Sequence, residues 1–284
     1  MHTVLSIQSA VAYGHAGNSA AVFPLQRVGV DVWPVYTVTF SNHTGYGAWR
    51  GPLIPAHDVA DVVTGVDERG VLGRVDALLA GYQGSPEVGQ VIVNAAQMVK
   101  QRNPAAVLCA DPVMGDVGRG FYARPGIPEF MRDRVVPAAD IMTPNLFELE
   151  YLTGATTRTV DDVLAAADEL RAAGPGIVVV TSVVAEGARP DAMRMIAVGA
   201  EGAWVVETPL LDRTFTGSGD LTTAMFLANW LGSRSLVEAL SATASIVYSV
   251  LEATATSGDL ELRLVAAQTD LVEPRFRFEA QPLR

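Results

Sequence analysis

Short runs of β-branched and other apolar residues alternate along the chain with longer stretches in which apolar residues recur every three or four positions. The runs predict strands, and the longer stretches predict amphipathic helices that bury one face. The predicted strands are residues 3–8, 30–36, 77–81, 106–111, 140–143, 177–181, 195–199 and 203–207. The predicted helices are residues 18–27, 56–69, 87–101, 145–152, 160–173, 219–231 and 235–254.

This alternation is typical of α/β proteins, in which βαβ units build a mainly parallel sheet with helices on both faces. The last two strands are separated only by Gly199-Ala-Glu-Gly202, which predicts a β-hairpin. No Ser/Gly/Pro-rich linker or charge run divides the 284 residues, and the chain is long enough for one large core. We therefore expect residues 1–284 to form a single domain.

The chain is acidic, with a net charge of -11 at pH 7. Nucleic acids and anionic membranes are bound through surplus Lys and Arg, so this charge argues against both and favours a small-molecule partner. The start, Met1-His-Thr-Val4, lacks the basic segment of a signal peptide, and no apolar run reaches the length of a membrane span. The single cysteine, Cys109, lies in an apolar run, where a buried residue is expected. These features predict a cytoplasmic protein without disulfides.

Only one of the 20 basic residues is a lysine, Lys100. A P-loop places a lysine directly after its glycines, and protein kinases place one on a strand against the phosphates. Lys100 lies instead in the polar end of a predicted helix with no glycine loop before it. Its surroundings also give no sign of the desolvated amine that forms a Schiff base with pyridoxal phosphate. The sequence therefore excludes both kinase classes and argues against that cofactor mechanism.

The segment Phe215-Thr-Gly-Ser-Gly-Asp220 places two glycines and a carboxylate where a loop becomes an apolar helix. The backbone N–H groups of Gly217, Ser218, Gly219 and Asp220 can converge there, and the helix dipole attracts a phosphate to the same point. Asp220 would then lie within reach of a hydroxyl brought up to that phosphate, and could take its proton during phosphoryl transfer. The alternative is that Asp220 only caps the helix.

Polar or glycine-rich segments follow most predicted strands, at the edge where open α/β sheets bind ligands. They are Ser9, Phe40-Ser-Asn-His-Thr-Gly-Tyr46, Gly81-Tyr82, Asp111-Pro-Val-Met-Gly-Asp116, Thr143-Pro-Asn-Leu-Phe-Glu148 and Thr181-Ser182. Asp111, Asp116, Asn145 and Glu148 offer the oxygen ligands that Mg²⁺ prefers beside a nucleotide. The spacing of Asn145 and Glu148 fits a helix-capping pair equally well, so both roles stay open. His43 lies in a segment that is expected to line a pocket, and no second His or Cys stands at zinc-ligand spacing.

Together these segments closely resemble the pyridoxal kinases of the ribokinase-like superfamily, from residue 3 to about residue 275. The Gly-Ser-Gly-Asp element indicates only the superfamily, whereas the Phe-Ser-Asn-His-Thr segment combined with Asp-Pro-Val-Met-Gly-Asp is specific to vitamin B6 kinases. The matching segments also include Tyr13-Gly-His-Ala-Gly-Asn-Ser-Ala-Ala21 and Val180-Thr-Ser182. The resemblance implies a ribokinase-like three-layer fold.

The activity that the resemblance implies is ATP-dependent phosphorylation of the 5'-hydroxymethyl group of pyridoxal, and of pyridoxine and pyridoxamine, to give the 5'-phosphate. The implied partners are ATP, Mg²⁺, a monovalent cation such as K⁺ or Na⁺, and a second copy of the chain.

Roles for individual residues are also implied by the resemblance. Asp220 resembles the base, and Gly217, Ser218 and Gly219 the amides that hold the phosphoryl group. Ser9 and Thr44 resemble the groups that hydrogen-bond the pyridine ring, in a pocket lined by His43 and Tyr82. Asn145, Thr181, Ser182 and Ser218 resemble residues that contact ATP. Asp116 and Glu148 resemble residues that organise Mg²⁺. Asp111, Thr143 and Thr181 resemble residues that bind a monovalent cation and phosphate oxygens.

One position departs from part of the family, since some bacterial relatives have a lysine where Thr181 stands. Charge neutralisation near the phosphates would then depend on metal ions and backbone amides. Arg119, in the variable segment Val117-Gly-Arg-Gly-Phe-Tyr122, could partly replace the missing cation, although a surface arginine is the alternative.

Three other functions are alternatives to this interpretation. A kinase for hydroxymethylpyrimidine or another small alcohol would share the fold. A B6-binding protein without catalysis would not need Asp220. A Rossmann-type oxidoreductase needs Gly-x-Gly-x-x-Gly after the first strand, and Ser9-Ala-Val-Ala-Tyr-Gly14 does not supply it.

Overall fold

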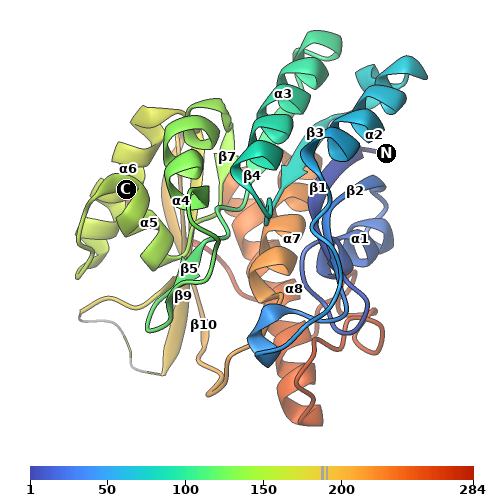
Figure 1. Ribbon diagram of the computed structural model, residues 1–284. Helices are drawn as coiled ribbons and strands as arrows, with labels where there is room; N and C mark the ends of the chain where they lie inside the picture. The colour runs from blue at the N-terminus through green and yellow to red at the C-terminus, as the bar shows by residue number, and fades with distance from the viewer. Residues whose placement is uncertain (187–188, 190) are drawn as a thin grey trace.

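The computed structural model describes residues 1–186, 189 and 191–284, and within them nine strands form one twisted sheet (Figure 1). The strand order is β11-β10-β9-β8-β7-β4-β3-β1-β2. The strands are β1 (Thr3–Val11), β2 (Asp31–Phe40), β3 (Ala77–Ala80), β4 (Val107–Ala110), β7 (Ile141–Met142), β8 (Ile177–Val183), β9 (Ala192–Gly199), β10 (Gly202–Pro209) and β11 (Gln281–Pro282). Pairing is parallel from β2 to β8 and antiparallel from β8 to β11. The predicted mainly parallel sheet and the hairpin at its end are both confirmed.

Helices cover both faces of the sheet and give three layers. One face carries α2 (Ala56–Glu68), α3 (Pro86–Arg102), α5 (Leu146–Thr153) and α6 (Val160–Ala173), and the other carries α1 (Asn18–Arg27), α7 (Ser218–Ser233) and α8 (Leu236–Ser257). Successive residues of β3 belong to different cores: Leu78 packs with the first set of helices and Leu79 with the second. Because side chains alternate along a strand, a strand buried on both faces is apolar throughout, as β3 is.

Five short elements between residues 115 and 138 were not predicted. The strands β5 (Gly115–Asp116) and β6 (Gly120–Phe121) form a separate hairpin, and α4 (Ile127–Phe130) leads into a π-helical turn at Met131–Val135 and a 3-10 turn at Val136–Ala138. Elements of two to five residues are too short to show a period in the sequence.

The prediction that no apolar run reaches the length of a membrane span is wrong for α8. Within the described residues, this one helix is long and apolar enough by composition, with a mean hydropathy of 1.4 over 18 residues. However, 61% of that window is buried inside the protein, against α7, β9 and β10. The apolar residues of α8 are therefore explained by its place in the core.

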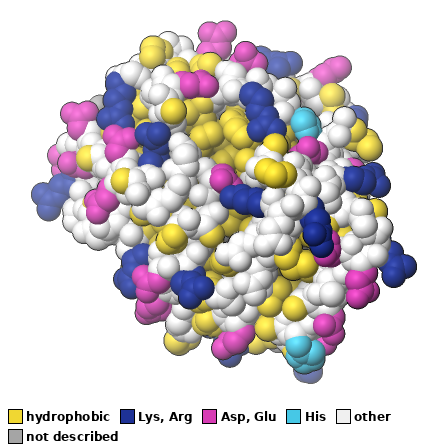
Figure 2. All heavy atoms as spheres, turned by 90° about the horizontal axis from the view of Figure 1, so that it is seen from above, with side chains coloured by type: hydrophobic (Ala, Val, Ile, Leu, Met, Phe, Trp, Pro, Cys, Tyr) yellow, Lys and Arg dark blue, Asp and Glu magenta, His cyan; other side chains and the backbone are white. Residues whose placement is uncertain are grey.

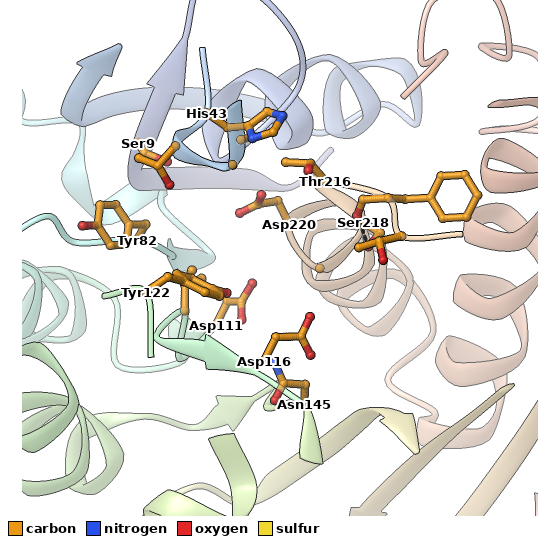
Figure 3. Close-up of a pocket in the computed structure, with 18 of the residues that line it drawn as sticks. Ser9, His43, Tyr82, Asp111, Asp116, Tyr122, Asn145, Thr216, Ser218 and Asp220 are labelled. Carbon is orange, nitrogen blue, oxygen red and sulfur yellow. Dashed lines mark hydrogen bonds between the residues drawn. The ribbon is translucent and has the colours of Figure 1, made fainter. Parts of the chain in front are cut away.

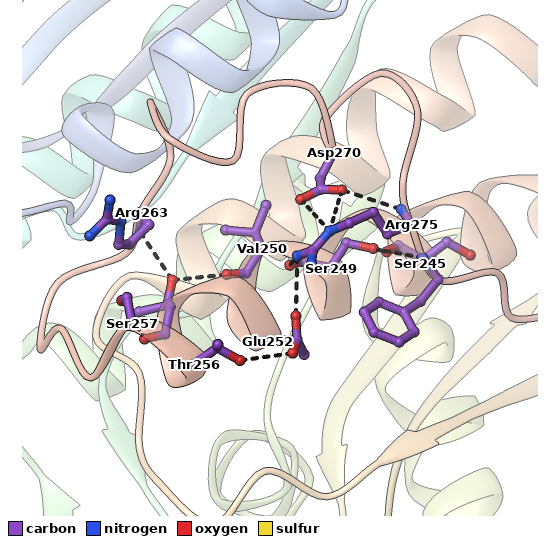
Figure 4. A network of polar contacts seen from close by, with 11 residues as sticks. Ser245, Ser249, Val250, Glu252, Thr256, Ser257, Arg263, Asp270 and Arg275 are labelled. Carbon is purple, nitrogen blue, oxygen red and sulfur yellow. Dashed lines mark hydrogen bonds and ion pairs between the residues drawn. The ribbon is translucent and has the colours of Figure 1, made fainter.

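The last residues of the chain lie extended along α8. The hydroxyl oxygens of Ser241, Ser245 and Ser249 accept hydrogen bonds from the backbone N–H groups of Ala280, Phe278 and Phe276, at 2.9, 2.9 and 3.2 Å. Four residues of helix rise about 6 Å, and two residues of extended chain about 6.6 Å, so the two repeats match. Near the start of this tail, Arg275 pairs with Asp270 and Glu252 (Figure 4). The tail then adds β11 to the edge of the sheet.

Acidic and basic side chains are interspersed over the face that Figure 2 shows, and neither sign forms a continuous field on it. This face therefore does not present the concentrated Lys and Arg that bind a phosphate backbone.

Candidate active site

The sequence-predicted site residues meet in one cavity of about 250 Å³ at the carboxyl edge of the sheet (Figure 3). The predicted residues that line it are Ser9, His43, Thr44, Tyr82, Asp111, Asp116, Thr143, Asn145, Glu148, Thr181, Ser182, Gly217, Ser218, Gly219 and Asp220. They come from segments up to 211 positions apart in the sequence, from residue 9 to residue 220. The rule that ligands bind beyond the carboxyl ends of parallel strands therefore located the cavity correctly.

A helix N-terminus faces the cavity where the anion cradle was predicted. Helix α7 begins at Ser218, and Gly217 occupies the N-cap position with φ +82°, a conformation that favours glycine. A Cβ at Gly217 would collide with the carbonyl oxygen of His15, so no other residue fits there. Among the described residues, the N–H groups of Gly219 and Asp220 have no acceptor. These two donors are free to bind an anion.

Asp220 does not cap the helix, because it is the third residue of α7 and Gly217 takes the cap position. Burial raises the pKa of Asp220 to about 6, and a hydrogen bond from the backbone N–H of Gly17 opposes that shift. Above pH 6 the group is a carboxylate, and a pKa near neutrality is suited to accepting and returning a proton.

Glu148 and Asn145 form a capping box at the start of α5. The Asn145 side chain accepts the Glu148 N–H at 3.0 Å, and Glu148 Oε2 accepts the Asn145 N–H at 3.0 Å. The other oxygen of Glu148 accepts the N–H of Met114, also at 3.0 Å. The capping alternative is thus realised in the structure. It does not exhaust the carboxylate, because each oxygen keeps a second lone pair.

Burial and neighbouring negative charges raise the pKa of two acidic groups of the cavity, Asp111 and Glu148. Asp111 and Glu148 are only 7% and 3% exposed. Burial raises the pKa of Asp111 well above its ordinary value, and the charges of Glu148 and Asp220 raise it further. Burial likewise raises the pKa of Glu148, against its hydrogen bonds from backbone N–H groups. Each group would be ionised more easily if a cation were present.

The oxygen ligands are spread around the cavity. Within the described residues, no group of three or more His, Cys, Asp or Glu side chains converges as a metal site. Asp116, half-buried on the β5–β6 hairpin, accepts the Val117 N–H, and Thr143 is hydrogen-bonded to Thr223 at 2.7 Å. Side chains alone therefore do not complete a coordination sphere. This suits Mg²⁺, which commonly takes one or two carboxylates together with phosphate oxygens and water.

Ser9 reaches the cavity from an irregularity in β1. The pairing of β1 with β2 shifts register between Gln8 and Ala10, and such a bulge changes the direction of a side chain. Gly17 lies so close that a Cβ there would collide with Ser9.

Tyr82 also lines the cavity, and its backbone carbonyl accepts a hydrogen bond from Thr37 at 2.7 Å. Burial raises the pKa of the Tyr82 phenol, which keeps it neutral.

A second irregularity places Thr181 and Ser182. The pairing of β8 with β9 shifts between Val180 and Val183, and Ser182 adopts φ +54°, which is unusual for a residue with a side chain. Backbone strain of this kind clusters at functional sites. Both residues line this cavity and also its neighbour.

That neighbouring cavity, of about 610 Å³, was not predicted. The residues that it shares with the first are Asp116, Thr181, Ser182, Thr214, Phe215, Ser218 and Gly219. Its apolar lining, drawn from several elements, includes Met195, Leu211, Phe215, Val247, Tyr248 and Leu251. A wall of this kind fits a flat heteroaromatic group, and the shared residues lie between it and the anion cradle. Apart from Phe215, which begins the segment Phe215-Thr-Gly-Ser-Gly-Asp220, no local motif marks these residues, since they come from β9, α8 and a loop.

The hairpin β5–β6 adds Arg119 and Tyr122 to the lining of the first cavity. The Arg119 guanidinium lies 5.3 Å from the centre of the Tyr122 ring. Among the described lining residues, Arg119 is the one Lys or Arg side chain, beside Asp111, Asp116, Glu148 and Asp220. Arg119 is exposed to solvent, so its position fits both predicted roles, a cation at the phosphates and a surface arginine.

Comparisons with known proteins agree with this geometry. A family model described as phosphomethylpyrimidine kinase matches residues 74–263. The chain is 57% identical to the pyridoxal kinase PdxY of Rubrobacter xylanophilus over 276 residues, which cover 97% of this chain and 95% of that one. It is also similar to the pyridoxal kinase of Leishmania donovani solved with ADP and pyridoxamine, at a TM-score of 0.93 and 27% identity over the whole of both chains. The complex of that enzyme with ADP and pyridoxine gives 0.92 and 28% over 99% of each chain.

Proposed function

Because this chain belongs to the pyridoxal kinase family and phosphorylates B6 vitamers with ATP, we propose that Asp220 is the base of the transfer. The observation that carries the proposal is the pairing of this carboxylate, whose pKa is raised to about 6, with the unpaired N–H groups at the start of α7. The Asp220 carboxylate can take a proton, and the N–H groups beside it can hydrogen-bond a negatively charged phosphoryl group. Phosphoryl transfer needs both, and otherwise mainly correct positioning.

In the proposed step, the 5'-hydroxymethyl oxygen of the vitamer attacks the γ-phosphorus of ATP. As the new P–O bond forms, the hydroxyl proton passes to Asp220, and the bond from the γ-phosphorus to the β,γ-bridging oxygen breaks to release ADP. The N–H groups of Gly219 and Asp220 hydrogen-bond the phosphoryl oxygens during the transfer. The vitamer 5'-phosphate and ADP are the products.

The vitamer ring lies between Ser9, Thr44, His43 and Tyr82 in this proposal. Ser9 and Thr44 provide hydroxyls for the ring substituents, and the two rings provide its walls. The position of Ser9 at a bulge, directly behind Gly17, supports a role for its hydroxyl in the cavity.

The nucleotide occupies the second cavity, with its base against the apolar residues Leu211, Val247 and Tyr248. Its phosphates pass Thr181, Ser182 and Asn145 and reach Ser218 and the cradle. Residues that line both cavities, among them Thr181, Ser182 and Ser218, support this path, since they connect the apolar wall to Asp220.

Mg²⁺ is held by Asp116 and Glu148, and a monovalent cation by Asp111, Thr143 and Thr181, in this proposal. Bound there, the cations neutralise charge on the phosphates. The burial of Asp111 and Glu148, which are 7% and 3% exposed, supports the assignment, because a bound cation stabilises the ionised form of a buried carboxylate. Arg119 adds a positive charge from the β5–β6 hairpin.

We further propose a single-domain cytoplasmic homodimer. The pairing of β11, from the C-terminus, in the same sheet as β1 supports one domain. Tyr36, Trp49 and Leu53, on β2 and the segment after it, are exposed and apolar, which supports a contact between two copies there. Light scattering over a range of protein concentrations tests the dimer.

The substrate is tested by ADP release with pyridoxal, pyridoxine, pyridoxamine and hydroxymethylpyrimidine, with and without Mg²⁺ and K⁺. We expect turnover with the B6 vitamers. Hydroxymethylpyrimidine is included because the matching family model is described as phosphomethylpyrimidine kinase. Preferential turnover of hydroxymethylpyrimidine would overturn the vitamer assignment, and binding of vitamers without any ADP release would overturn the catalytic one.

A further inference from the structure

Glu261, in the segment after α8, lies behind the active site and joins two loops that form it. Its Oε2 accepts the backbone N–H of His15 at 3.0 Å, and its Oε1 accepts the hydroxyl of Tyr46 at 2.7 Å. The Nε2 of His43 lies 3.2 Å from the same Oε1. The Glu261 side chain is only 11% exposed, so these contacts form largely out of solvent. The hydrogen bond to Glu261 also raises the pKa of Tyr46, which keeps its hydroxyl protonated as a donor.

The first loop, between β1 and α1, is shaped around this carboxylate. Gly14 has φ +86°, and a Cβ there would collide with the Glu261 carboxylate. Glycine is therefore required at residue 14 both for its backbone angle and for the space that Glu261 occupies. The segment Tyr13-Gly-His, which the sequence analysis placed among the family motifs, is explained by a residue near the other end of the chain.

This β1–α1 loop supports the reacting groups directly. The carbonyl of His15 packs on Gly217 of the cradle, and the backbone N–H of Gly17 donates to Asp220. A shift of the loop would therefore move a hydrogen bond of the base and the packing of the cradle together.

The second loop, residues 41–47, supplies the wall of the vitamer side. His43, Thr44 and Gly45 line the cavity, while Tyr46 packs on the ring of His43 at a centroid distance of 4.5 Å. The Tyr46 side chain is 41% exposed, so packing restrains it only in part. Its hydrogen bond to Glu261 therefore helps to fix the position of the hydroxyl group. Through Tyr46 and His43, Glu261 holds this loop against the β1–α1 loop.

We infer that Glu261 is a positioning residue for phosphoryl transfer: it fixes the vitamer-binding loop and the loop that supports Asp220 in one arrangement. It touches no reacting atom. The inference rests on the proposed vitamer site, since the affected loop must be the one that binds the vitamer.

The role divides into two arms that separate variants can test. Tyr46→Phe removes one of the two contacts of Glu261 with the vitamer loop and leaves those with His43 and His15, so KM for pyridoxal should rise several-fold with kcat unchanged. Glu261→Ala removes both arms and leaves the His15 N–H without an acceptor. Loss of hydrogen bonds to a charged group predicts a rise of about ten-fold or more in KM for pyridoxal, with a fall in kcat. Glu261→Gln, which keeps one acceptor oxygen, should recover part of both.

The experiment measures kcat and the KM values for pyridoxal and ATP on these variants, with melting temperatures. Glu273→Ala is the matched control, because Glu273 is exposed and its side chain makes no contact with the described residues that reaches hydrogen-bond or ion-pair distance. KM for ATP should stay within about two-fold of the wild type. Equal rises in both KM values, with a lowered melting temperature, would show a general structural role and overturn the inference.

Thr44→Ala distinguishes a failure of the inference from a failure of the site on which it rests. If Thr44→Ala raises KM for pyridoxal and Glu261→Ala does not, the vitamer site is correct and Glu261 does not position it. If neither variant changes that KM, the vitamer lies elsewhere and the inference falls with the site.

Discussion

Replacement of Asp220 by Asn separates the chemistry of this residue from its structural role. Asn keeps the size of the side chain and an oxygen that can accept the Gly17 N–H, but it cannot take a proton. Loss of a general base typically lowers the rate by about a hundred- to ten-thousand-fold. We expect kcat to fall by that factor, while the affinities for pyridoxal and ATP stay within about three-fold of the wild type, because the remaining contacts persist.

The structure also predicts the sign of the stability change. The pKa of Asp220 is about 6 in the folded protein against an ordinary value of 3.8, so the folded state holds the proton more tightly than the unfolded state does. The ionised carboxylate therefore costs stability above pH 6, and this cost disappears as the pH falls below about 4. Two pKa units correspond to roughly 3 kcal/mol as an upper bound. At pH 8 the Asn variant should be at least as stable as the wild type.

Three measurements test this pair of expectations: ADP release for turnover, calorimetry for binding, and thermal unfolding at pH 5 and pH 8. The wild-type rate should rise with pH through about 6 and level off above it, as expected for a base that must be ionised. Asp61→Asn, an exposed substitution on α2, is the control. A folded Asp220→Asn protein with near wild-type turnover would refute the assignment of the base, and a marked loss of stability at pH 8 would refute the electrostatic argument.

Three further variants test other parts of the molecule. Glu148→Gln should raise the Mg²⁺ concentration needed for half-maximal activity more than it changes KM for pyridoxal; a lower melting temperature with unchanged Mg²⁺ dependence would leave Glu148 as a capping residue only. Ser9→Ala should raise KM for pyridoxal by about ten-fold at most, the effect of one hydrogen bond, and an unchanged value would move the ring site elsewhere. Ser245→Ala should destabilise the protein by about 1–3 kcal/mol in chemical unfolding, because the N–H of Phe278 loses its acceptor. Thr64→Ala, which removes only a hydroxyl bonded to the carbonyl one turn earlier, should change little, and equal losses for the two would contradict the pairing of the tail with α8.

The sequence predicted those parts of the fold that repeat over many residues. The predicted ranges 18–27 and 160–173 coincide with α1 and α6. The ends of α6 are recognisable in the sequence, because the helix begins with a Thr159 capping box and stops before Gly174. Between residues 112 and 139 the hydrophobic pattern predicted no helix or strand, since β5, β6 and α4 are each too short to show a period. The position of the C-terminal tail was also not predicted, because the tail is held by hydrogen bonds to serine side chains of α8 and to the edge strand of the sheet, which no local pattern marks.

The site divides along similar lines. Residues directly after the strands were found, because the topology of a parallel sheet brings strand ends together wherever they lie in the chain. Glu261 was not found, since its bond to His15 spans 246 positions and no local pattern marks either residue as its partner. The apolar second cavity was missed for a related reason: Val247 and Tyr248 look like ordinary core positions of a helix, and only the packing of α8 beside β9 and β10 leaves space at them.

The electrostatics of the cavity connect the two substrates with the cations. Asp111, Glu148 and Asp220 all have their pKa raised by burial, and for Asp111 the other two charges add to the shift. A bare nucleotide would bring more negative charge to the same place, and the amides of α7 with Arg119 offer limited compensation. Cations that enter with the nucleotide would therefore do two things: they would offset the charge of the phosphates, and they would favour ionisation of the carboxylates around them. If Asp220 is the base, cations that enter with the nucleotide would also favour the ionised form that takes the proton. An acidic site can therefore bind an anionic nucleotide if the site binds the nucleotide together with its cations.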